Sequence, residues 1–160
     1  YEKTQCEIEG LVGRINGRFS TLDWTPVVLF SNAIPFEQLV AYFRIADVCV
    51  TTPLRDGLNL VAKEYVAAKQ GDPGVLILSE FAGCAVELTQ AVLTNPYSNR
   101  EMDRALDEAI DMPKAEAQRR MAGMDEVVRH YDIARWADQV AGQFDDLAAL
   151  PREGKARIAA

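Results

Sequence analysis

The sequence predicts an α/β fold in which helices cover both faces of a parallel sheet. Short runs that are apolar throughout alternate along the chain with longer segments whose apolar residues recur at helical spacing. Strands without a polar face, separated by helices, are typical of a parallel sheet that is buried on both sides. The 160 residues and the 49% hydrophobic content suffice for one globular domain with a real core.

Each element follows from its local pattern. Strands are predicted where a short apolar or β-branched run has a proline or glycine close to one end. These runs are residues 27–30, 47–51, 75–78 and 91–93. Helices are predicted from apolar spacing and capping residues, with Ser98 or Asn99 and Asp132 as caps. They span residues 2–18, 36–45, 58–69, 102–110, 113–131 and 133–147, and three glycines weaken the first of them.

Charge and composition exclude several classes of function. The formal net charge of −7 argues against nucleic acid as the main partner, because such binding depends on cations that meet phosphates. No apolar run is long enough to cross a membrane. Residues 1–6 contain neither an initiator methionine nor a signal-peptide pattern, so the chain is expected to begin inside a longer protein.

The wide spacing of the cysteines and the single histidine argue against a metal centre and against a disulfide scaffold. Cys6, Cys49 and Cys84 are far apart, and His130 is the only histidine. Cys49 lies in an apolar run and is interpreted as a small buried hydrophobe. For Cys84, beside Gly83, a reactive thiol is considered and disfavoured, because no histidine lies nearby in the sequence to activate it.

The most informative segment is the junction between the second predicted strand and the helix that follows it. The strand ends at Thr52, and Gly57 allows the backbone to turn tightly or to approach a ligand closely. The amino end of the next helix offers free N–H groups to a diphosphate or to sugar hydroxyls, with the carboxylate of Asp56 at the same place. Glu64 lies about two turns into this helix and faces either the ligand or solvent. The alternative interpretation is a simple Asp-Gly turn with Asn59 as a helix cap.

The same segment resembles a known family. Residues 53–67, Pro-Leu-Arg-Asp-Gly-Leu-Asn-Leu-Val-Ala-Lys-Glu-Tyr-Val-Ala, closely resemble the donor-binding signature of the trehalose-6-phosphate synthase family of retaining glucosyltransferases, which includes the glucosylglycerol-phosphate synthases. Further matches occur in the family's order, so the resemblance covers about residues 8 to 148. They are residues 13–19, 24–26, 73–83, 87–88, 95–97 and 131–136.

The resemblance implies the C-terminal half of a two-domain, GT-B-type glycosyltransferase with Rossmann-like halves. Residues 1–130 would form the nucleotide-sugar-binding domain, incomplete at its N-terminus. Residues 131–150 would form a helix that returns toward a missing N-terminal domain, and residues 151–160 a tail. The catalytic residues are expected in that missing part, and this chain alone is expected to show no turnover.

The resemblance also implies a role for each residue of the junction. Asp56 would bind glucose hydroxyls, and the backbone of Gly57, Leu58 and Asn59 would contact the glucose. The backbone of Leu60 and Val61 would reach the diphosphate, and Glu64 would hold the ribose hydroxyls. The class needs no metal and no cofactor beyond its nucleotide-glucose substrate. Ile34 stands where the family often has an aromatic residue, which leaves the nucleotide open among UDP, ADP and GDP.

The expected reaction transfers glucose, with retention, to a phosphorylated acceptor. Glucose 6-phosphate would give trehalose 6-phosphate, and glycerol 3-phosphate would give glucosylglycerol phosphate, both precursors of compatible solutes in a bacterial cytoplasm. The alternative is a non-catalytic nucleotide-sugar-binding or regulatory module of the same fold. The exposed stripe of Trp136, Val140 and Phe144 makes a homo-oligomer possible. Neither nucleic acid nor a membrane is expected as a partner.

Overall fold

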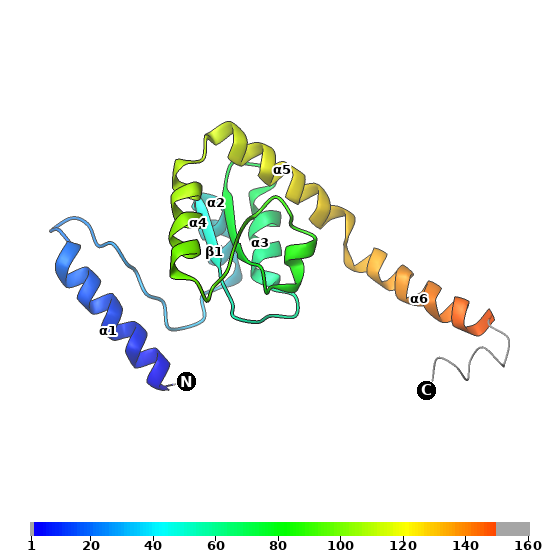
Figure 1. Ribbon diagram of the computed structural model, residues 1–160, viewed down its shortest axis with the longest axis horizontal. Helices are drawn as coiled ribbons and strands as arrows, with labels where there is room; N and C mark the ends of the chain where they lie inside the picture. Colours follow the sequence, from blue (N-terminus) through cyan, green and yellow to red (C-terminus); the bar gives the residue numbers. More distant parts are fainter. Residues whose placement is uncertain (1, 150–160) are drawn as a thin grey trace. The chain divides into compact units, whose positions relative to one another are not determined.

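Three parallel strands in the order β1-β2-β3 form the sheet of this protein. The computed structural model describes residues 2–149 (Figure 1), so the predicted tail 151–160 lies outside the described residues. The elements are α1 (Glu2–Phe19), α2 (Phe36–Ile45), β1 (Val48–Thr51), α3 (Leu60–Lys69), β2 (Val75–Ser79), the 3-10 turn η1 (Gly83–Val86), β3 (Val92–Thr94), α4 (Asn99–Asp111), α5 (Lys114–His130) and α6 (Ile133–Ala149). The chain is divided into two compact units between Leu39 and Val40, and the sheet lies in the second unit.

The central strand β2 is buried along its whole length, as its apolar sequence predicts. Its register places Val75 opposite Val48 of β1 and Ile77 opposite Val92 of β3. Because successive side chains of a strand point to opposite faces, β2 supplies Leu76 and Leu78 to one core and Val75 and Ile77 to another. Figure 1 shows α4 on one side of the strands and α3 on the other. The predicted two-sided α/β fold is therefore confirmed.

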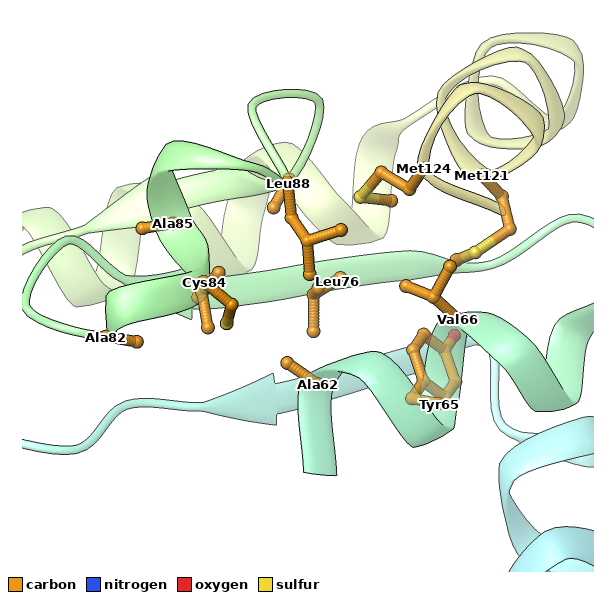
Figure 2. Packing of buried hydrophobic residues seen from close by; sticks show 12 residues of the cluster. Ala62, Tyr65, Val66, Leu76, Ala82, Cys84, Ala85, Leu88, Met121 and Met124 are labelled. Carbon is orange, nitrogen blue, oxygen red and sulfur yellow. The ribbon is translucent and has the colours of Figure 1, made fainter. Parts of the chain in front are cut away.

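The larger core joins α3, η1 and α5 to the sheet. Figure 2 shows Ala62 and Val66 of α3 on the side of Leu76, with the Tyr65 ring nearby, while Met121 and Met124 reach in from α5. Tyr65 also meets Phe43 of α2 edge-on, with ring centroids 6.0 Å apart. Tight packing of these side chains fixes α3 against the sheet and α5. The orientation of the α3 amino end, where the predicted site lies, thus depends on this core.

The smaller core lies under α4, on the other face. Ala105 and Ala109 pack there against Val75, Ile77 and Val92, and Ala117 at the start of α5 closes the end. The small alanines let α4 approach the sheet closely, and the charged residues of α4 lie on its outer face. The hydroxyl of Ser98 accepts a hydrogen bond from the Glu101 amide at 3.3 Å, so one of the two predicted caps of α4 is confirmed.

A buried lysine of α3 links this helix to the end of α2. Lys69 is only 4% exposed, and its ammonium donates to the carbonyl oxygens of Arg44 and Ala46 at 3.1 and 2.9 Å. These carbonyls belong to the carboxyl end of α2, where acceptors lack partners within the helix. Burial lowers the pKa of Lys69 from its ordinary value. The side chain therefore acts as a cap for α2 supplied by α3.

The prediction of a strand over residues 27–30 is wrong. These residues belong to no strand in the described structure, and Val28, Leu29 and Phe30 are exposed. The side chain of Asn16, eleven residues earlier, donates to the Val27 carbonyl at 2.9 Å and accepts from its amide at 3.0 Å. Helix α1 thus satisfies the two groups of Val27 that a neighbouring strand could bond, and an apolar run does not form a strand without such a neighbour.

The remaining helices agree with the sequence prediction, including the helix over residues 2–18. Helix α6 is capped by Asp132, whose carboxylate accepts from the Arg135 amide at 2.9 Å. On α6, Trp136 and Phe144 of the predicted apolar stripe are exposed, whereas Val140 is half-buried. Within residues 2–149, no helix combines the length and the apolarity needed to cross a membrane.

Candidate functional site

Two loops that leave the carboxyl ends of β1 and β2 are joined by backbone hydrogen bonds. The Asp56 amide donates to the Phe81 carbonyl at 3.2 Å, and the Gly83 amide donates to the Asp56 carbonyl at 3.0 Å. A third bond runs from the Cys84 amide to the Leu58 carbonyl at 2.9 Å. The parallel pairing of the strands thus continues beyond the sheet through an isolated bridge between Asp56 and Ala82. The two junctions that the sequence places at one edge of the sheet lie together.

The carboxylate of Asp56 is held by its own loop. Oδ1 accepts hydrogen bonds from the amides of Leu58 and Asn59 at 3.0 and 3.1 Å, and Oδ2 accepts from the side-chain amide of Asn59 at 3.1 Å. The Leu58 amide is the main cause of the lowered pKa of Asp56. A carboxylate offers about four acceptor positions, so one remains for a ligand hydroxyl. Asp56 is thus an ionised, oriented group with part of its capacity unused.

Asn59 caps α3 from an unusual backbone conformation. Its φ of 71° lies in the left-handed region, which asparagine tolerates better than most residues. The side-chain oxygen accepts from the Ala62 amide at 2.9 Å, so the cap interpretation of Asn59 is confirmed. This conformation also explains why the helix begins at Leu60 and not at the predicted Leu58.

The first amides of α3 remain open to a ligand. Within residues 2–149, Leu60 and Val61 have no acceptor for their N–H groups, whereas the amide of Ala62 is bonded to Asn59. Leu60 and Val61 are 61% and 45% exposed. Glu64 is exposed and follows them by one turn on the same face of the helix. The amino end of α3 therefore combines free donors, a positive dipole end and a carboxylate one turn further on.

Gly57 has no role in packing that would require a glycine. A Cβ atom added to it would meet no heavy atom within 4 Å in the described part of the chain, and its φ is not in the left-handed region. The backbone of Gly57 is thus open on the side where a side chain would project. Close approach of a ligand to the backbone is the physical reason that remains for a glycine here.

The structure adds an aromatic pair that the sequence analysis assigned to no role. Tyr97 follows β3 and meets Phe81 edge-on, with ring centroids 5.6 Å apart. Its hydroxyl donates to the Leu54 carbonyl at 3.5 Å. Phe81 and Tyr97 could have been identified as site residues from their position just after two predicted strands, because the loops at the carboxyl ends of parallel strands lie close together.

A cleft of about 580 Å³ borders the same helix end. Leu58, Leu60 and Lys63 line one side of it, and Trp136 at the start of α6 lies on another. Lys63 forms an ion pair with Glu87, so its charge is compensated within the protein. Within the described residues 2–149, no three His, Cys, Asp or Glu side chains are grouped in a way that could hold a metal ion.

The cysteines near the sheet are unsuited to nucleophilic chemistry. Cys84 is fully buried under the Asn59 carbonyl, and burial raises the pKa of its thiol. Burial also raises the pKa of Cys49 to about 11. Because the thiolate is the reactive form, a reactive thiol is disfavoured for both: Cys84 is a buried apolar group, and Cys49 is half-buried.

Comparisons with known proteins give the family. A model described as glycosyltransferase family 20 matches residues 1–146. The chain is 54% identical over 153 residues to glucosylglycerol-phosphate synthase from Picosynechococcus sp., which covers 96% of the chain and 31% of the relative. It is 44% identical over 158 residues to trehalose-6-phosphate synthase from Klebsiella pneumoniae, which covers 98% of the chain and 33% of the relative.

A solved structure shows the same fold. The α,α-trehalose-phosphate synthase (UDP-forming) from Burkholderia xenovorans, in complex with glucose-6-phosphate, is 45% identical with a TM-score of 0.84. The match covers 91% of this chain and 32% of that one, and the predicted GT-B-type architecture is thereby confirmed. The chain thus spans about a third of the length of these relatives.

Proposed function

This chain belongs to glycosyltransferase family 20, and we propose that it supplies the nucleotide-sugar site of a retaining glucosyltransferase. The observation that carries the proposal is the amino end of α3. The free amides of Leu60 and Val61 stand there beside the oriented carboxylate of Asp56. A diphosphate requires the former, and the hydroxyls of a hexose require the latter.

The donor binds along the junction in chain order. The remaining acceptor position of Asp56 receives a glucose hydroxyl, and the open side of Gly57 lets the sugar ring approach the backbone. The backbone of Leu58 and Asn59 was expected to contact the glucose, but both amides donate to the Asp56 carboxylate, so these residues contribute by fixing it. Leu60 and Val61 bind the diphosphate, and Glu64 accepts from the ribose hydroxyls. Each group therefore meets the part of the donor whose polarity it matches.

The chemistry of the site is stabilisation of the leaving group. When the bond between glucose and diphosphate breaks, negative charge grows on the diphosphate, and the helix amides offset that charge. The leaving diphosphate helps to deprotonate the acceptor hydroxyl, which adds to the sugar on the same face. The groups that close the site and hold the acceptor belong to sequence outside this chain. We therefore expect no turnover by residues 1–160 alone, because orientation and exclusion of water supply much of the rate.

The acceptor is a phosphorylated polyol or sugar. We propose glycerol 3-phosphate over glucose 6-phosphate on the sequence relationship alone, because the chain is 54% identical to the glucosylglycerol-phosphate synthase and 44% identical to the trehalose-6-phosphate synthase. The names of these relatives support a biosynthetic role, and we propose the cytoplasm as its location. Side-by-side assays of the full-length protein with both acceptors test this choice. Turnover with glucose 6-phosphate alone would contradict it.

Calorimetric titration of the chain with UDP-, ADP- and GDP-glucose tests the donor site. At least one should bind, and Asp56→Asn should weaken that binding about tenfold or more, since one charge-assisted hydrogen bond is lost. Asp72→Asn is the matched control, because Asp72 is an exposed carboxylate that pairs with Arg44. If none of the three donors binds, the proposal fails and a non-catalytic module of the same fold is favoured.

A further inference from the structure

The loop after β2 passes directly beneath the proposed donor loop, and the crossing point is a glycine. A Cβ atom added to Gly83 would lie 1.9 Å from the carbonyl oxygen of Gly57 and 2.6 Å from its carbonyl carbon. Real Cβ atoms essentially never come within 3.0 Å of another heavy atom, so the Gly57 peptide would have to move by more than about 1 Å. The atoms in the way are backbone, which cannot rotate aside as a side chain can.

This contact is supported on both sides by hydrogen bonds to the same loop. The Gly83 amide donates to the Asp56 carbonyl at 3.0 Å, and the next amide, that of Cys84, donates to the Leu58 carbonyl at 2.9 Å. The peptide of Gly57 is thus clamped between two bonds that start from adjacent residues. The neighbouring end of the loop is held from β3, where the Tyr97 hydroxyl donates to the Leu54 carbonyl at 3.5 Å.

We infer that Gly83 and Tyr97 are positioning residues of the donor site, which hold residues 54–58 where Asp56 and Gly57 meet the sugar. The inference rests on the proposed function and assigns the role to residues outside the helix junction. Neither side chain is required to touch the nucleotide-sugar. They act by fixing the backbone that does, because a binding group displaced by about 1 Å loses much of its interaction.

The test compares two glycines whose added methyl groups meet different neighbours. In Gly83→Ala the methyl group meets backbone, so the donor loop must shift. In Gly123→Ala the Cβ would lie 2.1 Å from the end of the Gln90 side chain, which can rotate away. Calorimetry with the nucleotide-glucose that the unmodified chain binds should give about tenfold weaker affinity for Gly83→Ala and unchanged affinity for Gly123→Ala. Thermal melting of both variants measures the fold independently.

Tyr97→Phe provides a second test in case Gly83→Ala does not fold. Tyr97 is exposed, so removal of its hydroxyl leaves the core intact, and the lost bond to Leu54 should weaken donor binding about twofold to fivefold. In the full-length enzyme, both changes should raise KM for the nucleotide-glucose and leave KM for the acceptor unchanged. Unchanged donor affinity in a folded Gly83→Ala, or in Tyr97→Phe if Gly83→Ala is unfolded, overturns the inference. Absence of donor binding by the unmodified chain instead overturns the proposed function.

Discussion

Asn59 donates its side-chain amide to the Asp56 carboxylate at 3.1 Å, while its side-chain oxygen accepts from the Ala62 amide at 2.9 Å. One residue therefore orients the acid that is proposed to bind sugar and caps the helix that is proposed to bind diphosphate. The interpretation of Asp-Gly-Leu-Asn as a turn with a cap and its interpretation as a ligand site are compatible. The turn is the means by which the ligand groups are held in place.

Replacement of Asn59 separates the cap from the backbone strain. We predict that Asn59→Ala lowers the free energy of unfolding by about 1–3 kcal/mol, because it loses the cap and places a Cβ at a φ of 71° without compensation. Asn59→Gly should cost less, since glycine adopts this φ freely. Urea unfolding of the chain measures both. Equal losses in the two variants would contradict the role assigned to the left-handed conformation.

Donor binding should be insensitive to mild acid. The pKa of Asp56 is lowered in the folded protein, first by the Leu58 amide, so the interactions of its carboxylate are present above the ordinary pKa of aspartate and are lost only as pH falls through the lowered value. The diphosphate of a nucleotide-sugar does not titrate in this range either. Calorimetry from about pH 8 to about pH 5 should therefore give a constant affinity.

The variant Asp56→Asn is the control for that pH dependence, because its side chain carries no titratable group. Its affinity should be lower throughout and equally flat. A fall in affinity of the unmodified chain between about pH 6 and about pH 5, absent from Asp56→Asn, would show that Asp56 takes up a proton there and would contradict the lowered pKa.

Gly57→Ala should separate ligand binding from folding. The added methyl group meets nothing within 4 Å in the described structure, so the melting temperature should stay the same. The methyl group would occupy the space proposed for the sugar, and donor affinity should fall about tenfold or more. In the control variant Gly142→Ala the added atom also meets open space, and donor affinity should not fall. Full affinity in Gly57→Ala would remove Gly57 from the site.

The three cysteines should differ sharply in reactivity. Cys6 is exposed, whereas Cys84 is buried and the pKa of Cys49 is raised to about 11. In the native chain at neutral pH, a thiol-specific colorimetric reagent should modify Cys6 rapidly and the other two only on unfolding. Cys6→Ser should abolish the rapid phase. Rapid native labelling of Cys84 would revive the hypothesis of a reactive thiol.

The fold could be predicted from the sequence wherever a segment carries its own signal. The apolar run at 75–78 identified the central strand, and Ser98 and Asp132 marked helix starts, because caps act within one turn. The run at 27–30 failed because pairing of a strand depends on a neighbour, which no local pattern contains. Its amide and carbonyl groups at Val27 are bonded by Asn16, eleven positions earlier in the chain.

The sequence by itself determined the fold class, the junction at residues 53–64 and the family, because each of these depends on patterns formed by residues that are neighbours in the chain. Only the tertiary structure decided how that junction is held. Three interactions join segments that follow three different strands: the contact between Gly83 and Gly57, the hydrogen bond from the Asp56 amide to the Phe81 carbonyl, and that from the Tyr97 hydroxyl to the Leu54 carbonyl. Parallel strands bring their carboxyl ends to one edge regardless of separation along the chain, so such contacts arise from sheet order and register and not from sequence spacing.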